Sequence, residues 1–224
     1  IGDCFLSGGG TSFRCNSFPT LAGDPTSGVS AHGFALTYAL QQSVPIGAQT
    51  ATVSWLRIAS TINAQVNGTS WIQCCVRGNL VTFGDRFFPA AAFGTDGHFR
   101  LTYSDRSDSS IAANQQGMAY NQWLTEVDNM NTLRGGAGTF VAYRIDSTLR
   151  DPGGGTFIGD YSGASNTSRG FDTYATYTVP SAAVNSVMTV QVCFANCYTN
   201  LAPYTPLVVS RGAGSTFADN FQMD

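Results

Sequence analysis

The segment TATVSWLRIAS, residues 50–60, decides the fold class of this chain. It is rich in β-branched and aromatic residues, which favour β-strands. The segment FALTYAL, residues 34–40, alternates large side chains with small or polar ones, the two-residue period of a half-buried strand. Between them, the Pro and Gly of VPIGA, residues 44–48, predict a turn. The regular part of the fold therefore starts with two strands.

Short strand patterns continue to the end of the chain, with Gly- or Asn-containing turn signals between them. Together with the first two, they predict ten strands and therefore an all-β fold, a jelly-roll-like antiparallel β-sandwich. The further strands are expected at residues 70–77, 80–83, 99–103, 139–145, 174–179, 187–194, 207–210 and 216–223.

The chain is expected to have one β-sandwich domain, residues 34–224, preceded by a different kind of segment. Residues 1–33 contain three successive glycines at positions 8–10 together with Pro19 and Pro25. Such residues interrupt regular structure, so we expect an irregular leader with at most one short strand. Cys4 and Cys15 are placed to close its Gly-rich loop.

One segment departs from the strand pattern. Between residues 118 and 130 the apolar positions fit one face of a helix better than they fit alternation. The prediction is a single short helix or a long wrapped loop, with Glu126 on its solvated side. The apolar positions are Met118, Trp123, Leu124, Val127 and Met130.

Composition excludes several classes of protein. The 224 residues include 11 Arg and no Lys, Glu126 is the single glutamate, and the formal net charge is -3. No apolar run approaches the length of a membrane-spanning helix, and the weakly acidic balance argues against a nucleic-acid partner. Without lysine there is no Schiff-base chemistry and no P-loop. A packed domain with a polar, weakly charged surface is expected.

Six cysteines are an even number, which favours disulfides in an exported protein. A zinc site built from the vicinal pair and the later C-x3-C is the alternative, but no histidine lies near either pair. In a strand, Cys74 and Cys75 point to opposite faces, so each can have its own partner among the last two cysteines. A bridge between those last two is equally open. The six are Cys4, Cys15, Cys74, Cys75, Cys193 and Cys197.

Two further features favour a secreted, extracellular or cell-surface protein. The sequence opens on Ile1 with neither a Met nor a signal peptide, as a processed mature chain would. Asn67 and Asn166 lie in N-x-S/T sequons, which predict glycosylation of exposed loops, although such short matches also arise by chance.

Residues capable of catalysis are few. Most glycosidases need two carboxylates, and the scattered aspartates form no such signature. No G-x-S-x-G elbow occurs. Asp96 and His98 form the best acid–base pair, although a turn followed by a surface histidine is the favoured interpretation. Tyr143, Arg144 and His98 are the ingredients that a polysaccharide lyase would need.

A family resemblance rests on three passages. LQQSVP at residues 40–45, the following ATVSW strand, and TFADNFQM at residues 216–223 resemble the galactose-binding-like β-sandwich of bacterial carbohydrate-binding modules and surface proteins. The resemblance implies a sandwich fold over residues 34–224. It also implies a structural calcium ion, with Asp24 and Asp219 as the positions to test, although each can equally be an ordinary turn or cap residue.

Aromatic side chains offer a glycan-binding surface, because sugar rings stack on exposed aromatic faces. Trp71, Trp123, Tyr120 and Tyr161 are expected in loops or at strand ends, although a core position is the commoner role for any one of them.

Three functions compete on these grounds. The leading hypothesis is a non-enzymatic secreted structural protein, a self-assembling filament or cell-surface subunit whose partners are copies of itself. A polar surface with little charge would let such subunits approach closely. The alternative is a glycan-binding adhesive protein with a polysaccharide partner. A lyase or hydrolase ranks third, because fold alone does not fix function.

Overall fold

A computed structural model describes residues 5–8, 11–14, 19–26, 33–46, 49–62, 71–77, 85–106, 120–146, 162–166, 172–179, 186–193 and 207–210. The described part is all-β and antiparallel with one four-residue helix, which confirms the predicted fold class. The elements are β1 (Phe5–Gly8), β2 (Thr11–Arg14), β3 (Thr20–Asp24), β4 (Gly33–Ile46), β5 (Gln49–Thr61), β6 (Ile72–Arg77), β7 (Arg86–Phe93), β8 (Phe99–Asp105), β9 (Asn121–Val127), α1 (Met130–Leu133), β10 (Phe140–Arg144), β11 (Gly163–Asn166), β12 (Asp172–Val179), β13 (Ser186–Cys193) and β14 (Leu207–Ser210).

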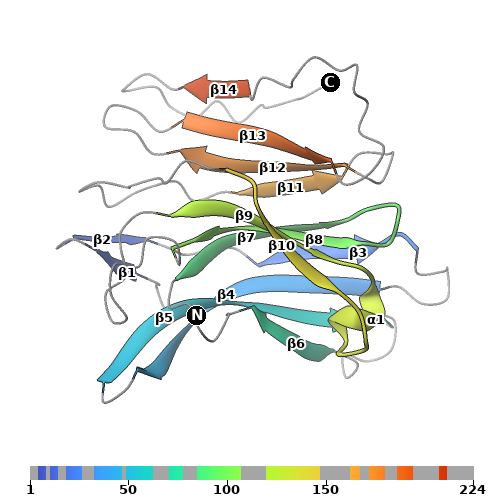
Figure 1. The fold of residues 1–224 in the computed structure, drawn as a ribbon, viewed down its shortest axis with the longest axis horizontal. Coiled ribbons are helices and arrows are strands. Elements are labelled where there is room, and N and C mark those ends of the chain that lie inside the picture. The colour runs from blue at the N-terminus through green and yellow to red at the C-terminus, as the bar shows by residue number, and fades with distance from the viewer. Residues whose placement is uncertain are drawn as a thin grey trace.

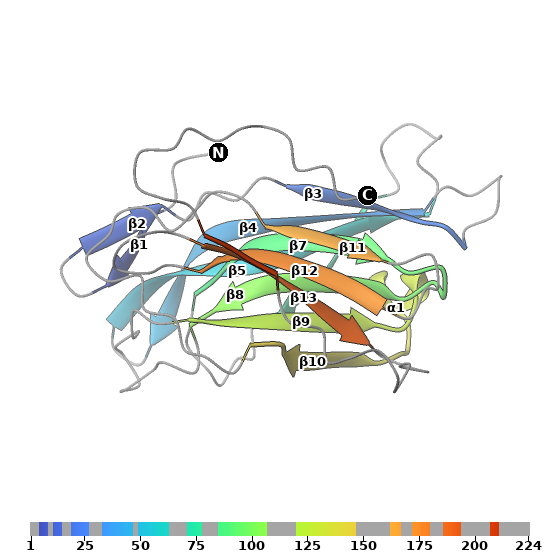
Figure 2. The same cartoon turned by 90° about the horizontal axis from the view of Figure 1, so that it is seen from above.

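The strands form three four-stranded sheets and the small hairpin β1-β2. The sheet orders are β3-β4-β5-β6, β10-β9-β8-β7 and β11-β12-β13-β14. In Figure 1 the sheet β7–β10 lies between the other two, and Figure 2 looks across its four strands in order. Within the described residues each sheet is a meander, in which strands adjacent in sequence are adjacent in space. The crossing connections of a jelly roll are not among them, so jelly-roll topology stays a prediction.

The main core lies between the sheets β3–β6 and β7–β10. Alternate residues of β4 and β5, including Ala35, Leu56 and Ile58, meet Phe99 and Leu101 of β8 in one buried cluster. Burying each larger side chain stabilises the fold by about 1.5–3 kcal/mol. The two-residue alternation puts the small residues Ala35 and Thr37 of β4 and the large residues Leu56 and Ile58 of β5 on this buried face. The large side chains of β4 therefore lie on its other face. The packing of these two sheets is sandwich-like.

The hairpin of β4 and β5 is longer than the sequence indicated. Its register runs from Phe34 opposite Thr61 to Ile46 opposite Gln49. The predicted turn at residues 44–48 is therefore too wide, since Val44, Pro45 and Ile46 are still paired. Strands of 14 and 13 residues result.

The expectation that residues 1–33 are irregular is wrong for the parts described. β1 and β2 pair as a hairpin from Phe5 opposite Arg14 to Gly8 opposite Thr11. β3 pairs with β4 from Thr20 to Asp24 and buries Ala22 in the main core. Tertiary pairing with β4 thus overrides the Gly and Pro signals that flank β3.

The predicted helix at residues 118–130 is also wrong. Residues 121–127 form β9, the helix α1 starts only at Met130, and Glu126 belongs to a strand. β9 lies between β8 and β10, and side chains on both its faces are buried. Only Trp123 and Glu126 of this strand are partly exposed. A strand covered on both faces does not alternate, so its apolar spacing can imitate that of a helix.

β7 is a strand that the sequence did not predict. Its sequence RFFPAAAF contains Pro89 and three alanines, which are poor strand formers. The register shifts between Phe87 and Ala90, and Phe88 adopts a φ of 51° within this bulge. β7 is an edge strand of its sheet, where a bulge and a proline are tolerated. The expected strands at residues 80–83 and 216–223 lie outside the described residues.

No helix in the described part of the chain has the length and apolar character needed to cross a lipid bilayer.

Candidate functional site

A tight turn and the first residues of β8 build the most polar cluster on the sheet β7–β10. Gly97 N–H donates to Gly94 O at 3.0 Å, and Gly97 has the positive φ of 78° that glycine tolerates best. Asp96 Oδ1 accepts from the His98 backbone N–H at 3.1 Å. Alternation then places His98 and Arg100 on the face opposite to the core residue Phe99.

Arg100 is the buried cation of this cluster. Its guanidinium donates to both oxygens of Asp96, at 3.2 Å (Nη1 to Oδ1) and 2.6 Å (Nη2 to Oδ2). Nη2 also donates to Glu126 Oε1 at 2.9 Å, because Glu126 of β9 lies directly opposite Arg100 in the antiparallel register. Only 1% of the Arg100 side chain is exposed. Charge-assisted bonds of this kind are what makes burial of a guanidinium tolerable.

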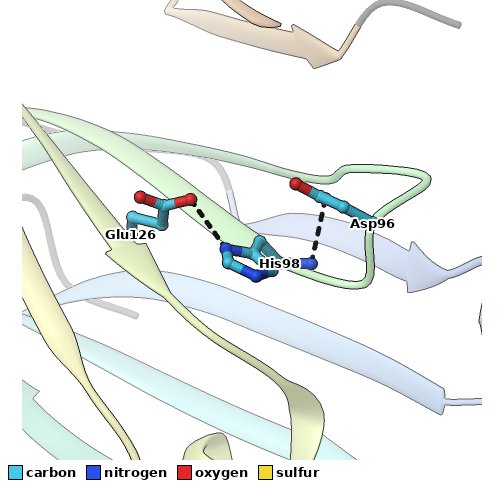
Figure 3. A group of neighbouring side chains, drawn as sticks. All are labelled: Asp96, His98 and Glu126. Carbon is cyan, nitrogen blue, oxygen red and sulfur yellow. Dashed lines mark hydrogen bonds and ion pairs between the residues drawn. The ribbon is translucent and has the colours of Figure 1, made fainter. Parts of the chain in front are cut away.

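His98 completes the cluster from the solvent side. Its Nδ1 lies 2.7 Å from Glu126 Oε1, as Figure 3 shows. A carboxylate paired with Arg100 is an acceptor, so Nδ1 carries the proton and donates. Nε2 is then left as the ring nitrogen available to a ligand. The His98 side chain is 37% exposed, whereas that of Glu126 is 13% exposed.

Tyr143 reaches the same carboxylate from β10. Its pKa is raised, first by burial of the hydroxyl and then by the negative charge of the nearby Glu126. Val141, two residues earlier on the same face, lies opposite Glu126 in the β9–β10 register. Both residues remain accessible, with Tyr143 38% and Val141 42% exposed.

A metal ion is one candidate occupant of this cluster. Asp96, His98 and Glu126 each offer a ligand atom, and these atoms lie within 4.8 Å of one another, the one such group among the described residues. However, Arg100 already bonds both carboxylates from a buried position. A metal ion would have to displace this guanidinium, so the arrangement fits a closed ion-pair network better than a metal centre.

Of the two predicted calcium residues, the structure describes Asp24. Asp24 Oδ1 accepts from the Thr26 backbone N–H at 2.9 Å and from the Thr26 hydroxyl at 2.7 Å. This is the turn-starting role that the sequence offered as the alternative. Asp219 lies outside the described residues.

The four aromatic residues proposed for glycan binding are not one platform. Trp71 is 38% exposed beside β6, whereas Trp123 is half-buried and packs against the main core. Tyr120 is 1% exposed and packs edge-on against Phe87, with ring centroids 5.3 Å apart, so its ring cannot stack on a sugar. That placement is a correction to the expected surface. Tyr161 lies outside the described residues.

The cysteines and sequons lie outside the described residues or in strands of which only the backbone is described. Cys4, Cys15, Cys197 and Asn67 lie outside the described residues. Only the backbone is described for Cys74 and Cys75 in β6, Cys193 in β13 and Asn166 in β11. Disulfides and glycosylation at these positions stay predictions.

The acid–base residues considered from sequence are partly assembled. His98 and Tyr143 both lie beside Glu126. Arg144 directly follows Tyr143 in β10, so its side chain belongs to the opposite face of the strand. Sequence reasoning missed Arg100 and the strand position of Glu126. The available signal was the spacing of Asp96, His98 and Arg100 at every second position before a run of alternating core residues.

Comparison with family models, with curated proteins and with solved structures finds no match to this chain. The resemblance to galactose-binding-like domains therefore stays an expectation, and function must be argued from this structure's own surfaces.

Proposed function

We propose that this protein is a non-enzymatic extracellular structural subunit that binds copies of itself through the outward face of the sheet β3–β6. The observation that carries this proposal is the apolar character of that face. Leu21 is 57% exposed and Leu40 is 42% exposed, on strands whose other face forms the main core. The outward face is formed by Leu21, Phe34, Leu36, Tyr38, Leu40, Arg57, Ala59 and Gln73.

The outward face forms continuous rows across the sheet. One row runs from Leu21 through Leu36 and Ala59 to Gln73 on successive strands. Large side chains that lie side by side on an exposed sheet make a contiguous patch, and such patches mark interaction sites more often than isolated apolar residues do. Covering such a surface costs little free energy of desolvation, because few polar groups lose their water.

A second copy is the partner that this face fits best. Among the described side chains of the outward face, Arg57 is the only charged one, and the whole chain has a formal net charge of only -3. Two such faces can therefore be stacked without rows of like charge opposing one another. An identical face offers the same apolar rows, as a two-fold symmetric interface requires.

Growth beyond a dimer requires a second contact. β3 and β6 are the edge strands of this sheet in the described part of the chain. Edge strands carry backbone groups that can pair with a strand from another molecule. Face-to-face stacking combined with edge pairing is a route to filaments or layers. The lysine-free composition and the even number of cysteines support an extracellular location for the assembly.

Sedimentation velocity and electron microscopy of the purified protein test this proposal. We expect dimers or larger assemblies in the wild type and a shift towards monomer in Leu40→Asp, which puts a charge into the outward face. Val141→Asp is the matched control, since Val141 is equally exposed but lies on the sheet β7–β10. A wild-type protein that stays monomeric at high concentration contradicts the proposal, as does equal assembly of both variants and wild type.

A second candidate function, glycan binding, is favoured by the end of the same sheet at β6. Trp71 is exposed there, and Gln73 donates a hydrogen bond from Nε2 to the Tyr38 hydroxyl. An open indole beside amide and hydroxyl groups suits a sugar ring. A glycan array with wild type and Trp71→Ala tests it, and signals that survive the substitution count against this location.

A further inference from the structure

A second amphipathic surface lies on the sheet β7–β10, away from the proposed assembly face. We call it the Tyr143 patch, and it consists of Val141 and Tyr143 of β10, Glu126 of β9 and His98 before β8. Two of its members, Val141 and Tyr143, are exposed large apolar side chains on one face of the same strand. The other two bring a carboxylate and an imidazole to their side.

The polar groups of the patch are fixed before any ligand arrives. His98 Nδ1 is bonded to Glu126 Oε1, and Tyr143 lies close enough to Glu126 for that charge to raise its pKa. Glu126 is in turn held by Arg100, whose side chain is 1% exposed. A ring and two polar groups that are already oriented lose little conformational entropy on binding.

Some hydrogen-bonding capacity remains for a ligand. His98 and Arg100 both bond Oε1 of the Glu126 carboxylate, which has roughly four acceptor positions, so acceptor capacity remains for a ligand. His98 bonds Glu126 through Nδ1, so Nε2 remains available to a ligand. The patch therefore combines an accessible aromatic ring and an aliphatic side chain with acceptors that suit hydroxyl groups.

We propose that the Tyr143 patch is a binding site for a neutral saccharide unit. The C–H face of the sugar lies on the Tyr143 ring and against Val141, and the sugar hydroxyls bond His98 Nε2 and a remaining Glu126 acceptor position. This function goes beyond self-assembly and uses a different sheet, so it does not depend on the assembly proposal.

Charge determines which saccharides fit. In the part of the chain that the structure describes, the ionisable groups that face or adjoin His98 are Asp96 from the preceding turn, Arg100 from β8, Glu126 and Asp128 from β9 and its end, and Tyr143 from β10. Three carboxylates against one guanidinium leave two negative charges in excess when His98 is neutral. Uronic and sialic acids would be repelled. The same excess argues against a lyase that acts on uronate polymers.

Isothermal titration calorimetry with the full-length protein tests the site. The probes are cellopentaose and mannopentaose as neutral oligosaccharides, and an oligogalacturonate as the acidic one. We expect at least one neutral probe to bind and the acidic probe not to bind. Tyr143→Ala should weaken binding about tenfold through loss of the stacking surface. Tyr143→Phe, which keeps the ring, should retain more affinity than Tyr143→Ala.

Ile62→Ala is the control, because it removes an exposed large apolar side chain, 45% exposed, directly after β5 and outside both proposed glycan sites. Trp71→Ala is measured beside it, to distinguish the Tyr143 patch from the glycan site proposed next to β6. Circular dichroism verifies that each variant is folded. The proposal is overturned if neither neutral probe binds wild type, if Tyr143→Ala binds like wild type, if only Trp71→Ala abolishes binding, or if the oligogalacturonate binds more tightly than the neutral probes.

Discussion

Arg100 Nη2 lies 2.9 Å from Glu126 Oε1, across the β8–β9 ladder and beneath an exposed histidine. This contact holds the only glutamate of the chain in an ion pair and keeps it available to His98 and Tyr143. Removing the guanidinium leaves two carboxylates, Asp96 and Glu126, without their buried counter-charge.

Arg100→Met is therefore expected to destabilise the fold by about 3–5 kcal/mol, the usual cost of breaking a buried pair from one side. Urea unfolding measures the change. The same variant should gain stability in Zn²⁺, because the position between three candidate ligands is vacated. Wild type should show no such gain, and a zinc-dependent rise in the melting temperature of wild type would contradict the closed-network interpretation.

A second buried pair joins the far ends of β7 and β8. Arg86 Nε donates to Asp105 Oδ2 at 2.6 Å, and both side chains are at most 6% exposed. Asp105→Asn leaves the arginine without its charge partner and should cost about 3–5 kcal/mol in the free energy of unfolding. Asp24→Asn, in an exposed turn, is the control and should change stability by less than about 0.5 kcal/mol. Similar losses in both variants would argue against a buried pair.

The lowered pKa of Asp128 predicts that the free energy of unfolding depends on pH in the acid range. Its pKa is lowered mainly by the hydrogen bond from the Thr132 hydroxyl, with further bonds from Thr139. Because the pKa is lower in the folded state, the stabilisation is present above the unfolded value, near 3.8, and is lost as the pH falls through the folded value. Asp128→Asn should flatten this part of the stability–pH curve. Unfolding experiments at a series of acidic pH values measure the effect.

The raised pKa of Tyr143 predicts that stability falls as the pH rises in the alkaline range, the opposite direction to the effect of Asp128. The Tyr143 pKa is raised by burial and by Glu126, so folding favours the protonated phenol. This stabilisation is present below the unfolded value of 10.0 and is lost as the pH rises through the folded value. Ultraviolet absorbance should show one tyrosine that ionises late, and this component should disappear in Tyr143→Phe. Its persistence in that variant would assign it to another tyrosine.

Gly138 permits a close approach beneath α1. A Cβ at this position would lie 1.8 Å from Thr132 Oγ1 and 2.7 Å from Asp128 Oδ1. Gly138→Ala should therefore open the Asp128–Thr132 contact and destabilise the fold by about 1–3 kcal/mol. At Gly23 the nearest atom would be 3.4 Å away, in ordinary contact, so Gly23→Ala is the control. Thermal unfolding of the two variants gives the comparison, and equal melting temperatures would contradict the expected clash.

Sequence reasoning succeeded where side chains of two kinds alternate along a strand. Large residues alternate with small or polar ones from Phe34 to Leu40, and apolar residues alternate with polar ones from Phe99 to Tyr103, and both segments are strands as predicted. It failed at β9, where Leu124, Thr125 and Val127 are all buried and the alternation is lost. It failed at β7 because Pro89 and the alanines that follow are poor strand formers, and only a bulge at a sheet edge accommodates them.

The sequence by itself determined the all-β class, the presence of strands at β4, β5 and β8, and a chain with few charges, because alternation and composition are local properties of the chain. Only the tertiary structure decided that Glu126 meets His98 and Arg100, which are 28 and 26 residues away in sequence. That meeting depends on the register between β8 and β9. Register is set by which faces are buried, and β9, covered on both faces, has no pattern that reveals it.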